Sequence, residues 1–346
     1  MALLLSFFLS REGAQLLILF GVAILRVGVE ALNVESTGSS VSRRDLFFDV
    51  AAVASGVGGL LLPSQAAFGD SDASQPIAIL GASGRTGALC ITACLRRGLP
   101  CRALTRSGSW APPVGNEDEI SSILNNNLLT VAACDVKDPK ALANSLKGCR
   151  GVVYAASASK QGGNAKEIDN DGVVTAGNVC LAQNIARYIV ISSTAVTRPH
   201  SMGYKFTNIF GGIMEQKRFG EEGIQFAYKS ARGTSSYSIL RPGGLEEPKK
   251  NEILGPKSLE ISQGDALAGI VSRSDLAEVA VELAVSNAEN LRNTALELYY
   301  ADSTQPCERQ FKPMMTNGVV PRLNGFSTYA GLLEGVQPDI DYYVPS

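Results

Sequence analysis

The stretch Gly81-Ala82-Ser83-Gly84-Arg85-Thr86-Gly87 determines the fold that we expect of this chain. It follows a short apolar run at residues 76–80 and opens a helical pattern that Gly98 and Pro100 end. Between a strand and a helix, the first glycine permits a tight turn and the second lets the backbone approach a pyrophosphate. The third lets the helix pack closely on the strand, and the amide groups that start the helix would face the phosphates.

We therefore predict that this segment binds a dinucleotide; the alternative is a glycine turn with a structural role only. The residues expected at the phosphates are Gly81, Ser83, Gly84, Arg85, Thr86 and Gly87.

Short apolar runs and helical patterns alternate along the rest of the chain. Strands are expected at residues 76–80, 101–105, 128–133, 151–155, 188–192, 237–240 and 296–300. Helices are expected at residues 85–97, 139–146, 168–186, 208–228 and 274–285. This alternation implies an α/β fold, a Rossmann-like, doubly wound parallel sheet with helices on both faces. We place this single domain at residues 71–302 and a less regular C-terminal extension, on the substrate side, at residues 303–346.

The composition excludes several classes of protein. The chain has 346 residues, with 31 basic and 33 acidic side chains, so it shows no basic footprint for nucleic acid. The one histidine, His200, rules out a metal site built from several histidines. A Ser-His-Asp hydrolase would depend on that same residue, and the chain has no GxSxG nucleophile elbow. We predict no metal site and no nucleic-acid partner.

Residues 1–70 are expected to be a targeting leader. Two apolar runs, at residues 16–25 and 50–62, are shorter than the roughly 20 residues of a membrane span. Between them, Ser42-Arg43-Arg44-Asp45-Leu46-Phe47 resembles a twin-arginine export signal. Two export signals in series resemble the leader of an algal plastid protein, which predicts a chloroplast location with thylakoid association. A secretory signal and an uncleaved membrane anchor are the alternatives, and the seven cysteines without a CxxC favour a reducing compartment.

The residue after the second expected strand indicates which dinucleotide binds. NAD sites usually carry an acidic residue there, whereas this chain has Arg106, and Arg85 can face the same place. Two guanidinium groups suit a 2′-phosphate, so we predict NADP(H) in preference to NAD. The alternative is that both arginines are solvated surface charges. Trp110, beyond this strand, either caps the adenine or packs beside it.

Polar or small motifs follow the later strands in a fixed order. These motifs are Asp135-Val136, Ala155-Ala156-Ser157, Ser192-Ser193-Thr194 and Arg241-Pro242-Gly243-Gly244. With the glycine loop and Arg106, the chain over residues 75–300 resembles an atypical short-chain dehydrogenase/reductase. It is similar to the NAD(P)H-binding subgroup that includes flavin and biliverdin reductases and chloroplast NADP-binding proteins of import and photosystem assembly.

The resemblance implies roles for these motifs. Asp135 and Val136 would contact the adenine, although a turn or helix cap is the alternative for Asp135. Residues Ala155, Ala156 and Ser157 would line the ribose and nicotinamide, and Pro242 and Gly243 would close over the nicotinamide.

The catalytic pattern departs from the family. Standard members use Tyr-x-x-x-Lys on the helix after the fifth strand, and here Lys217 matches the lysine while Ile213 replaces the tyrosine. Ile213 cannot transfer a proton, and the nearest phenols lack the spacing. Ser193, Thr194 and Lys217 remain the candidate catalytic residues, with a solvated helix charge as the alternative for Lys217. For His200, a proton donor and a surface loop residue are both open.

Two classes of function follow. One is an NADPH-dependent oxidoreductase acting on a small carbonyl, quinone, flavin or pigment-like molecule, because the cofactor itself carries the hydride chemistry. The other is a non-catalytic NADP-binding redox sensor or assembly factor, which the missing tyrosine favours. The sequence does not identify the substrate or the oligomeric state.

Overall fold

The structure is a computed structural model of the chain, and it describes residues 74–112, 123–158, 163–209, 211–229, 231, 233–246, 252–306 and 322–338. These residues belong to one compact unit, 66–346. The predicted leader at residues 1–70 lies outside the described residues. Within the described ranges, no helix has the length and apolar character that crossing a bilayer requires.

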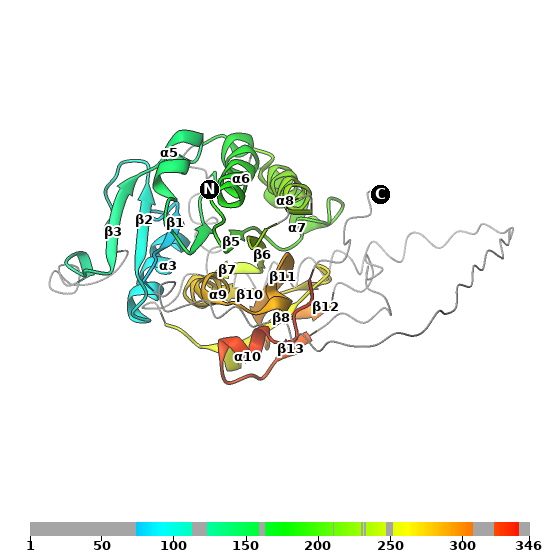
Figure 1. Ribbon diagram of the computed structural model, residues 1–346. Coiled ribbons are helices and arrows are strands. Elements are labelled where there is room, and N and C mark those ends of the chain that lie inside the picture. Colours follow the sequence, from blue (N-terminus) through cyan, green and yellow to red (C-terminus); the bar gives the residue numbers. More distant parts are fainter. Residues whose placement is uncertain are drawn as a thin grey trace, which may run out of the picture. The chain divides into compact units, whose positions relative to one another are not determined.

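A nine-stranded sheet forms the centre of the fold, in the order β13-β8-β11-β6-β5-β4-β1-β2-β3 (Figure 1). The strands are β1 (Ile77–Leu80), β2 (Cys101–Thr105), β3 (Leu129–Ala133), β4 (Gly151–Tyr154), β5 (Arg187–Ile191), β6 (Ser236–Pro242), β8 (Leu259–Ser262), β11 (Thr294–Tyr300) and β13 (Arg322–Asn324). The seven strands from β3 to β11 run parallel, whereas β8 and β13 pair antiparallel. The predicted doubly wound parallel sheet is confirmed, and the antiparallel edge was not expected.

Helices cover both faces of this sheet, as Figure 1 shows. On one face lie α3 (Arg85–Arg96), α9 (Arg273–Val285) and the short α10 (Tyr329–Leu333). The other face carries α5 (Pro139–Ser145), α6 (Val173–Ala182) and α8 (Ile213–Lys229). In β1, Ile77 and Ile79 join the core on the α3 side, while Ala78 joins the core on the α6 side. A strand buried on both sides therefore reads as a continuous apolar run.

Two of the expected helices differ from the prediction. The expected helix at residues 168–186 begins as a π-helix, η1 (Lys166–Gly172), which continues directly into α6. The expected helix at residues 208–228 is instead two helices, α7 (Met202–Asn208) and α8. Gly211 and Gly212 separate them with φ values of +77° and +71°, a backbone conformation that no α-helix contains.

Short elements complete the unit. Two-stranded pairs are formed by β7 (Gly244–Glu246) with β10 (Ile270–Ser272) and by β9 (Leu267–Ala268) with β12 (Gln305–Pro306), and the 3₁₀ turns are η3 (Pro256–Ser258) and η4 (Glu289–Leu291). In the expected C-terminal extension, β13 pairs with β8, and Leu332 and Leu333 of α10 are buried in the α3–α9 core. Part of residues 303–346 thus completes one edge of the main fold.

The strand order reverses between β1 and β4. From β1 the chain moves outward through β2 to β3, and then returns to place β4, β5, β6 and β11 on the other side. In open α/β sheets, ligands bind outside the carboxyl ends of the strands at this switch point. The segments that follow β1 and β4 therefore form the candidate site.

Candidate cofactor site

The glycine loop after β1 lies directly against the segment after β4. Gly81 has a φ of +78°, and a Cβ on it would stand 2.6 Å from the backbone nitrogen of Ala156. No side chain fits such a gap, and the left-handed backbone also favours glycine. Ala155 and Ala156 are half-buried beside it, and Ser157 is exposed. The switch point thus brings together two of the predicted cofactor-binding segments.

The remaining glycines of the loop bring α3 close to the turn. A Cβ on Gly87 would stand 2.3 Å from the carbonyl oxygen of Gly81, so the helix packs on the loop as predicted. Gly84 is the N-cap of α3, without a side-chain cap and without an acidic residue in the first turn. Ser83, Gly84 and Arg85 are exposed, and Thr86 is half-buried. The amide groups of this helix end and its positive potential suit a phosphate.

The buried Trp110 supports the loop from behind. Its Nε1 donates a hydrogen bond to the carbonyl oxygen of Ala82 at 2.9 Å, and the side chain is 7% exposed within the α3–α9 core. Trp110 was expected either to cap the adenine or to pack beside it, and its contacts are those of a packed core residue.

The residues predicted to bind the adenine and the 2′-phosphate follow β2 and β3 or lie at the start of α3. Arg106 directly follows β2 and is exposed, as is Arg85 at the start of α3. The Asp135 carboxylate accepts a hydrogen bond from the backbone nitrogen of Lys137 at 3.0 Å, which makes a turn of the kind considered as the alternative. Val136 is buried in the α6-side core.

Lys217 is not a solvated helix charge. Its Nζ lies 2.9 Å from Oδ1 of Asp169, and the two side chains are 13% and 0% exposed. The same carboxylate accepts hydrogen bonds from the Ser157 hydroxyl at 2.7 Å and from the backbone nitrogen of Ala158 at 2.8 Å. A buried ammonium–carboxylate pair therefore holds the hydroxyl of Ser157, an exposed residue at the switch point.

Asp169 had no place in the sequence analysis. It belongs to the π-helix η1, and π-helical turns occur frequently at functional sites. Close packing of α8 on η1 brings Lys217 within reach, because a Cβ on Gly220 would stand 2.4 Å from the carbonyl oxygen of Asp169. The sequence signal that could have identified Asp169 is an acidic residue within an otherwise helical, partly apolar segment facing a lysine of the next helix.

Thr194 lies inside a buried polar network after β5. Its hydroxyl donates to Oδ1 of Asp265 at 3.0 Å and lies 2.8 Å from the Tyr299 hydroxyl. Asp265 is fully buried and also accepts from the backbone nitrogen of Ala195 at 2.7 Å and forms an ion pair with Arg198 at 3.2 Å. These contacts fix the loop after β5, and the Thr194 hydroxyl takes part in them.

Backbone strain occurs in the loop after β5 and in the loop between β8 and β9. Ala195 and Asp265 have φ values of +65° and +53°, although neither is glycine. Such conformations persist where surrounding bonds determine them, and they concentrate at functional sites. The backbone nitrogen of Thr194 donates to the Pro242 carbonyl at 3.0 Å, which joins the loop after β5 to the end of β6. Ser193 is half-buried, and its hydroxyl donates to the Thr194 carbonyl at 3.1 Å.

The end of β6 is supported by a buried ion-pair cluster. Arg241 lies 2.7 Å from Glu221 of α8 and 3.1 Å from Glu297 of β11, and all three side chains are at most 5% exposed. Burial raises the pKa of Glu297 to about 7, the charge of Arg241 lowers it, and the charge of Asp265 raises it again. Beside this cluster, a Cβ on Gly243 would stand 2.4 Å from the Gly269 carbonyl oxygen. Pro242 and Gly243 are both buried.

The tyrosines near Lys217 and Thr194 are buried within the fold. Tyr204 is buried with Ala195 and Met214, and Ile213 packs against this cluster. The Tyr228 hydroxyl donates to the Gly177 carbonyl at 3.4 Å, and Tyr299 is fully buried, with its hydroxyl donating to Leu267 at 2.9 Å. His200 is exposed in the loop before α7.

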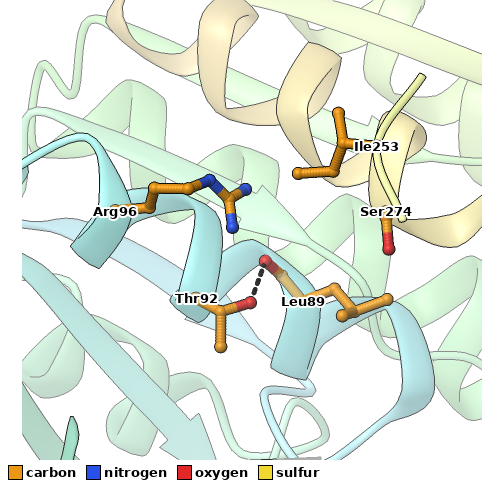
Figure 2. A pocket seen from close by; sticks show the side chains of 5 residues that line it. All are labelled: Leu89, Thr92, Arg96, Ile253 and Ser274. Carbon is orange, nitrogen blue, oxygen red and sulfur yellow. Dashed lines mark hydrogen bonds between the residues drawn. The ribbon is translucent and has the colours of Figure 1, made fainter. Parts of the chain in front are cut away.

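A separate small pocket lies between α3 and the start of α9. Figure 2 shows its lining, with Leu89, Thr92 and Arg96 of α3 opposite Ile253 and Ser274. Its volume of about 90 Å³ suits a few water molecules and not a dinucleotide. In the described ranges, no cluster of three or more His, Cys, Asp or Glu side chains is arranged to hold a metal ion.

The sequence is similar to that of known proteins. The family described as NAD(P)H-binding matches residues 81–287. An uncharacterised chloroplastic protein of Arabidopsis thaliana is 28% identical over 222 residues, which cover 60% of this chain and 71% of that protein.

Solved structures share the fold. ChuY, an anaerobilin reductase from Escherichia coli O157:H7, has a TM-score of 0.50 at 21% identity, over 67% of this chain and 100% of its own. A short-chain dehydrogenase/reductase from Veillonella parvula in complex with NADP has a TM-score of 0.50 at 15% identity, over 66% of this chain and 96% of its own. The match over residues 81–287 shows that the chain belongs to the NAD(P)H-binding family, and its fold is that of proteins of the short-chain dehydrogenase/reductase type.

Proposed function

We propose that this protein is an NADPH-dependent oxidoreductase that reduces a small carbonyl, quinone, flavin or pigment-like acceptor. The observation that carries the proposal is the Ser157–Asp169–Lys217 chain beside the glycine loop. A buried charge pair is costly to maintain unless it is well bonded, and this one holds the hydroxyl of Ser157 in the segment that faces the glycine loop.

Preference for NADPH is supported by the charges at the end of β2. Arg106 occupies the position where an NAD site usually has a carboxylate, and Arg85 supplies a second exposed guanidinium at the start of α3. Both can form charge-assisted hydrogen bonds with a 2′-phosphate.

Bound NADPH would supply the hydride, and the protein's own residues would bind and orient the acceptor. The Asp169 carboxylate fixes both the Lys217 ammonium and the Ser157 hydroxyl, so these two groups form the polar wall next to the crevice. Ile213 leaves the site without the usual phenol as proton donor. Acceptors that take their proton from water, such as flavins, quinones and linear pigments, fit this arrangement better than simple ketones. ChuY, which shares the fold, is an anaerobilin reductase according to its name.

A chloroplast location is part of the proposal. It is supported by the twin-signal pattern of residues 1–70 and by the chloroplastic relative from Arabidopsis. A non-catalytic NADP-binding sensor or assembly factor is the second candidate, favoured by Ile213 in place of tyrosine.

The oxidation of NADPH with flavin, quinone and bilin acceptors distinguishes the two candidates. We expect turnover with at least one acceptor, and Ser157→Ala and Lys217→Met should lower kcat while NADPH still binds. Lys166→Met, which removes an exposed lysine of η1, serves as the control and should leave kcat unchanged. If NADPH binds tightly but none of the acceptors is reduced, the result would support the non-catalytic sensor or assembly factor instead.

A further inference from the structure

The turn after β2, at residues 106–110, is held by hydrogen bonds at both of its ends. At its start, the hydroxyl of the buried Thr105 donates to the Ser109 carbonyl oxygen at 2.9 Å. At its end, Nε1 of Trp110 donates to the carbonyl oxygen of Ala82, in the glycine loop, at 2.9 Å. One end of the turn is therefore fixed to β2 and the other to the glycine loop.

The glycine loop is also bonded to β2 itself. The backbone nitrogens of Gly81 and Ala82 both donate to the carbonyl oxygen of Leu104, at 3.2 Å and 3.1 Å. Together with the Trp110 bond, these contacts close a hydrogen-bonded ring that runs from the glycine loop through the end of β2 and the turn, and back to Ala82. Arg106 is an exposed member of this ring. The ring therefore fixes the backbone of Arg106 relative to the loop expected at the pyrophosphate.

Trp110, the single tryptophan of the chain, closes this ring through its side chain. The indole is 7% exposed in the α3–α9 core, where a phenylalanine could fill most of the same space. An indole has one hydrogen-bond donor, and here the glycine loop accepts from it. The bond to Ala82 is therefore what the tryptophan contributes beyond packing.

We propose that Trp110 is a positioning residue for the cofactor, which holds Arg106 where the 2′-phosphate of NADPH lies when its pyrophosphate is on the glycine loop. A guanidinium group binds a phosphate through paired hydrogen bonds, which require a defined geometry. NADH lacks the 2′-phosphate, so its affinity depends less on the position of Arg106. The inference rests on the proposed preference for NADPH, and it does not depend on any reaction.

Titration of NADPH and NADH, followed by the fluorescence of the bound nicotinamide, tests the inference without an acceptor substrate. Trp110→Phe keeps an aromatic side chain in the core and removes the hydrogen bond to Ala82. It should lower the preference for NADPH over NADH by about threefold or more, the value of one net hydrogen bond. Thr105→Val releases the other end of the turn and should lower the preference in the same way; it decides the test should Trp110→Phe not fold.

Tyr300→Phe is the matched control. Tyr300 is also 7% exposed in the α3–α9 core, and its hydroxyl donates to Asp275 at 2.7 Å. The variant therefore loses one buried hydrogen bond outside the ring. It should lower the stability of the fold and leave the preference for NADPH unchanged, and urea denaturation shows that each variant is folded.

Combining Trp110→Phe with Arg106→Ala shows whether Trp110 acts through Arg106. In the Arg106→Ala protein, Trp110→Phe should leave the ratio of the two affinities unchanged. The inference alone is overturned if the preference depends on Arg106 but survives Trp110→Phe and Thr105→Val, or if Trp110→Phe changes the ratio equally with and without Arg106. If the wild-type protein shows no preference, or Arg106→Ala retains it, the proposed preference for NADPH fails and the inference fails with it.

Discussion

The ammonium group of Lys217 lies 2.9 Å from the carboxylate of Asp169, and the carboxylate is fully buried. The pair joins α8 to the π-helix η1 and, through Ser157, to the segment after β4. Lys217 lacks the tyrosine of the family motif, because Ile213 stands in its place, but it has Asp169 as its ion-pair partner. The pair therefore helps to hold the segment after β4 that faces the glycine loop.

Removing one member of this pair should be costly. Asp169→Ala leaves the Lys217 charge buried without its partner, so we expect a loss of about 3–5 kcal/mol in the free energy of unfolding. Asp171→Ala is the matched control, because the Lys166–Asp171 pair is exposed and should contribute less than about 1 kcal/mol. Urea denaturation measures both. The double variant Asp169→Ala, Lys217→Met should recover part of the lost stability. Equal losses for Asp169→Ala and Asp171→Ala would contradict the account.

The glycine loop allows an equally direct comparison. Gly81 and Gly98 both have a positive φ, of +78° and +66°, but only Gly81 faces the backbone of Ala156. Gly98→Ala should cost about 1–2 kcal/mol from backbone strain alone. Gly81→Ala should cost more, because the loop after β1 must move away from β4, and it should abolish dinucleotide binding.

Denaturation and NADPH titration of the two variants check this prediction. Should Gly81→Ala bind NADPH like the wild type, or lose no more stability than Gly98→Ala, the close approach of the two loops would not be required.

Glu297 should make stability depend on pH. Burial raises its pKa from 4.5 to about 7, so the folded protein holds this proton more tightly than the unfolded chain. The unfolding free energy should therefore fall as the pH rises from about 4.5 to about 7, by about 3 kcal/mol at most. Glu297→Gln removes this titration, so the variant should gain stability relative to the wild type between pH 5 and pH 8. A difference that stays constant between these pH values would show that Glu297 does not titrate there.

The sequence predicted those features whose cause is local. Each of the seven expected strands is present. All of them except the edge strand β3 are largely buried, and a parallel strand buried on both faces is a short apolar run. The turn at Gly81 and the close packing of Gly87 follow from the spacing of the glycines. By contrast, β13 is three residues long, and its pairing with β8 joins distant segments, so nothing local indicates it.

The residues of the candidate site also divide into those that a local motif predicts and those that depend on distant contacts. Lys217 was found from its position in a motif, but Asp169 and Asp265 were not, because their roles arise from contacts with residues far away in the sequence. Thr194 had the right position for a substrate contact, and the structure shows its hydroxyl bonded to Asp265. The pair Gly211-Gly212 could have predicted the break between α7 and α8, but the helical pattern on either side favoured one continuous helix.

The central claim is that the crevice beside the glycine loop binds NADPH, with Arg106 on the 2′-phosphate. Titration of NADPH and NADH, followed by nicotinamide fluorescence, tests it most directly. We expect the wild-type protein to bind NADPH at least about tenfold more tightly than NADH, and Arg106→Ala to remove most of this preference while NADH affinity is retained. Lys140→Ala, at an exposed position of α5, should change neither affinity. If neither dinucleotide binds, or if Arg106→Ala leaves the preference for NADPH unchanged, the account is contradicted.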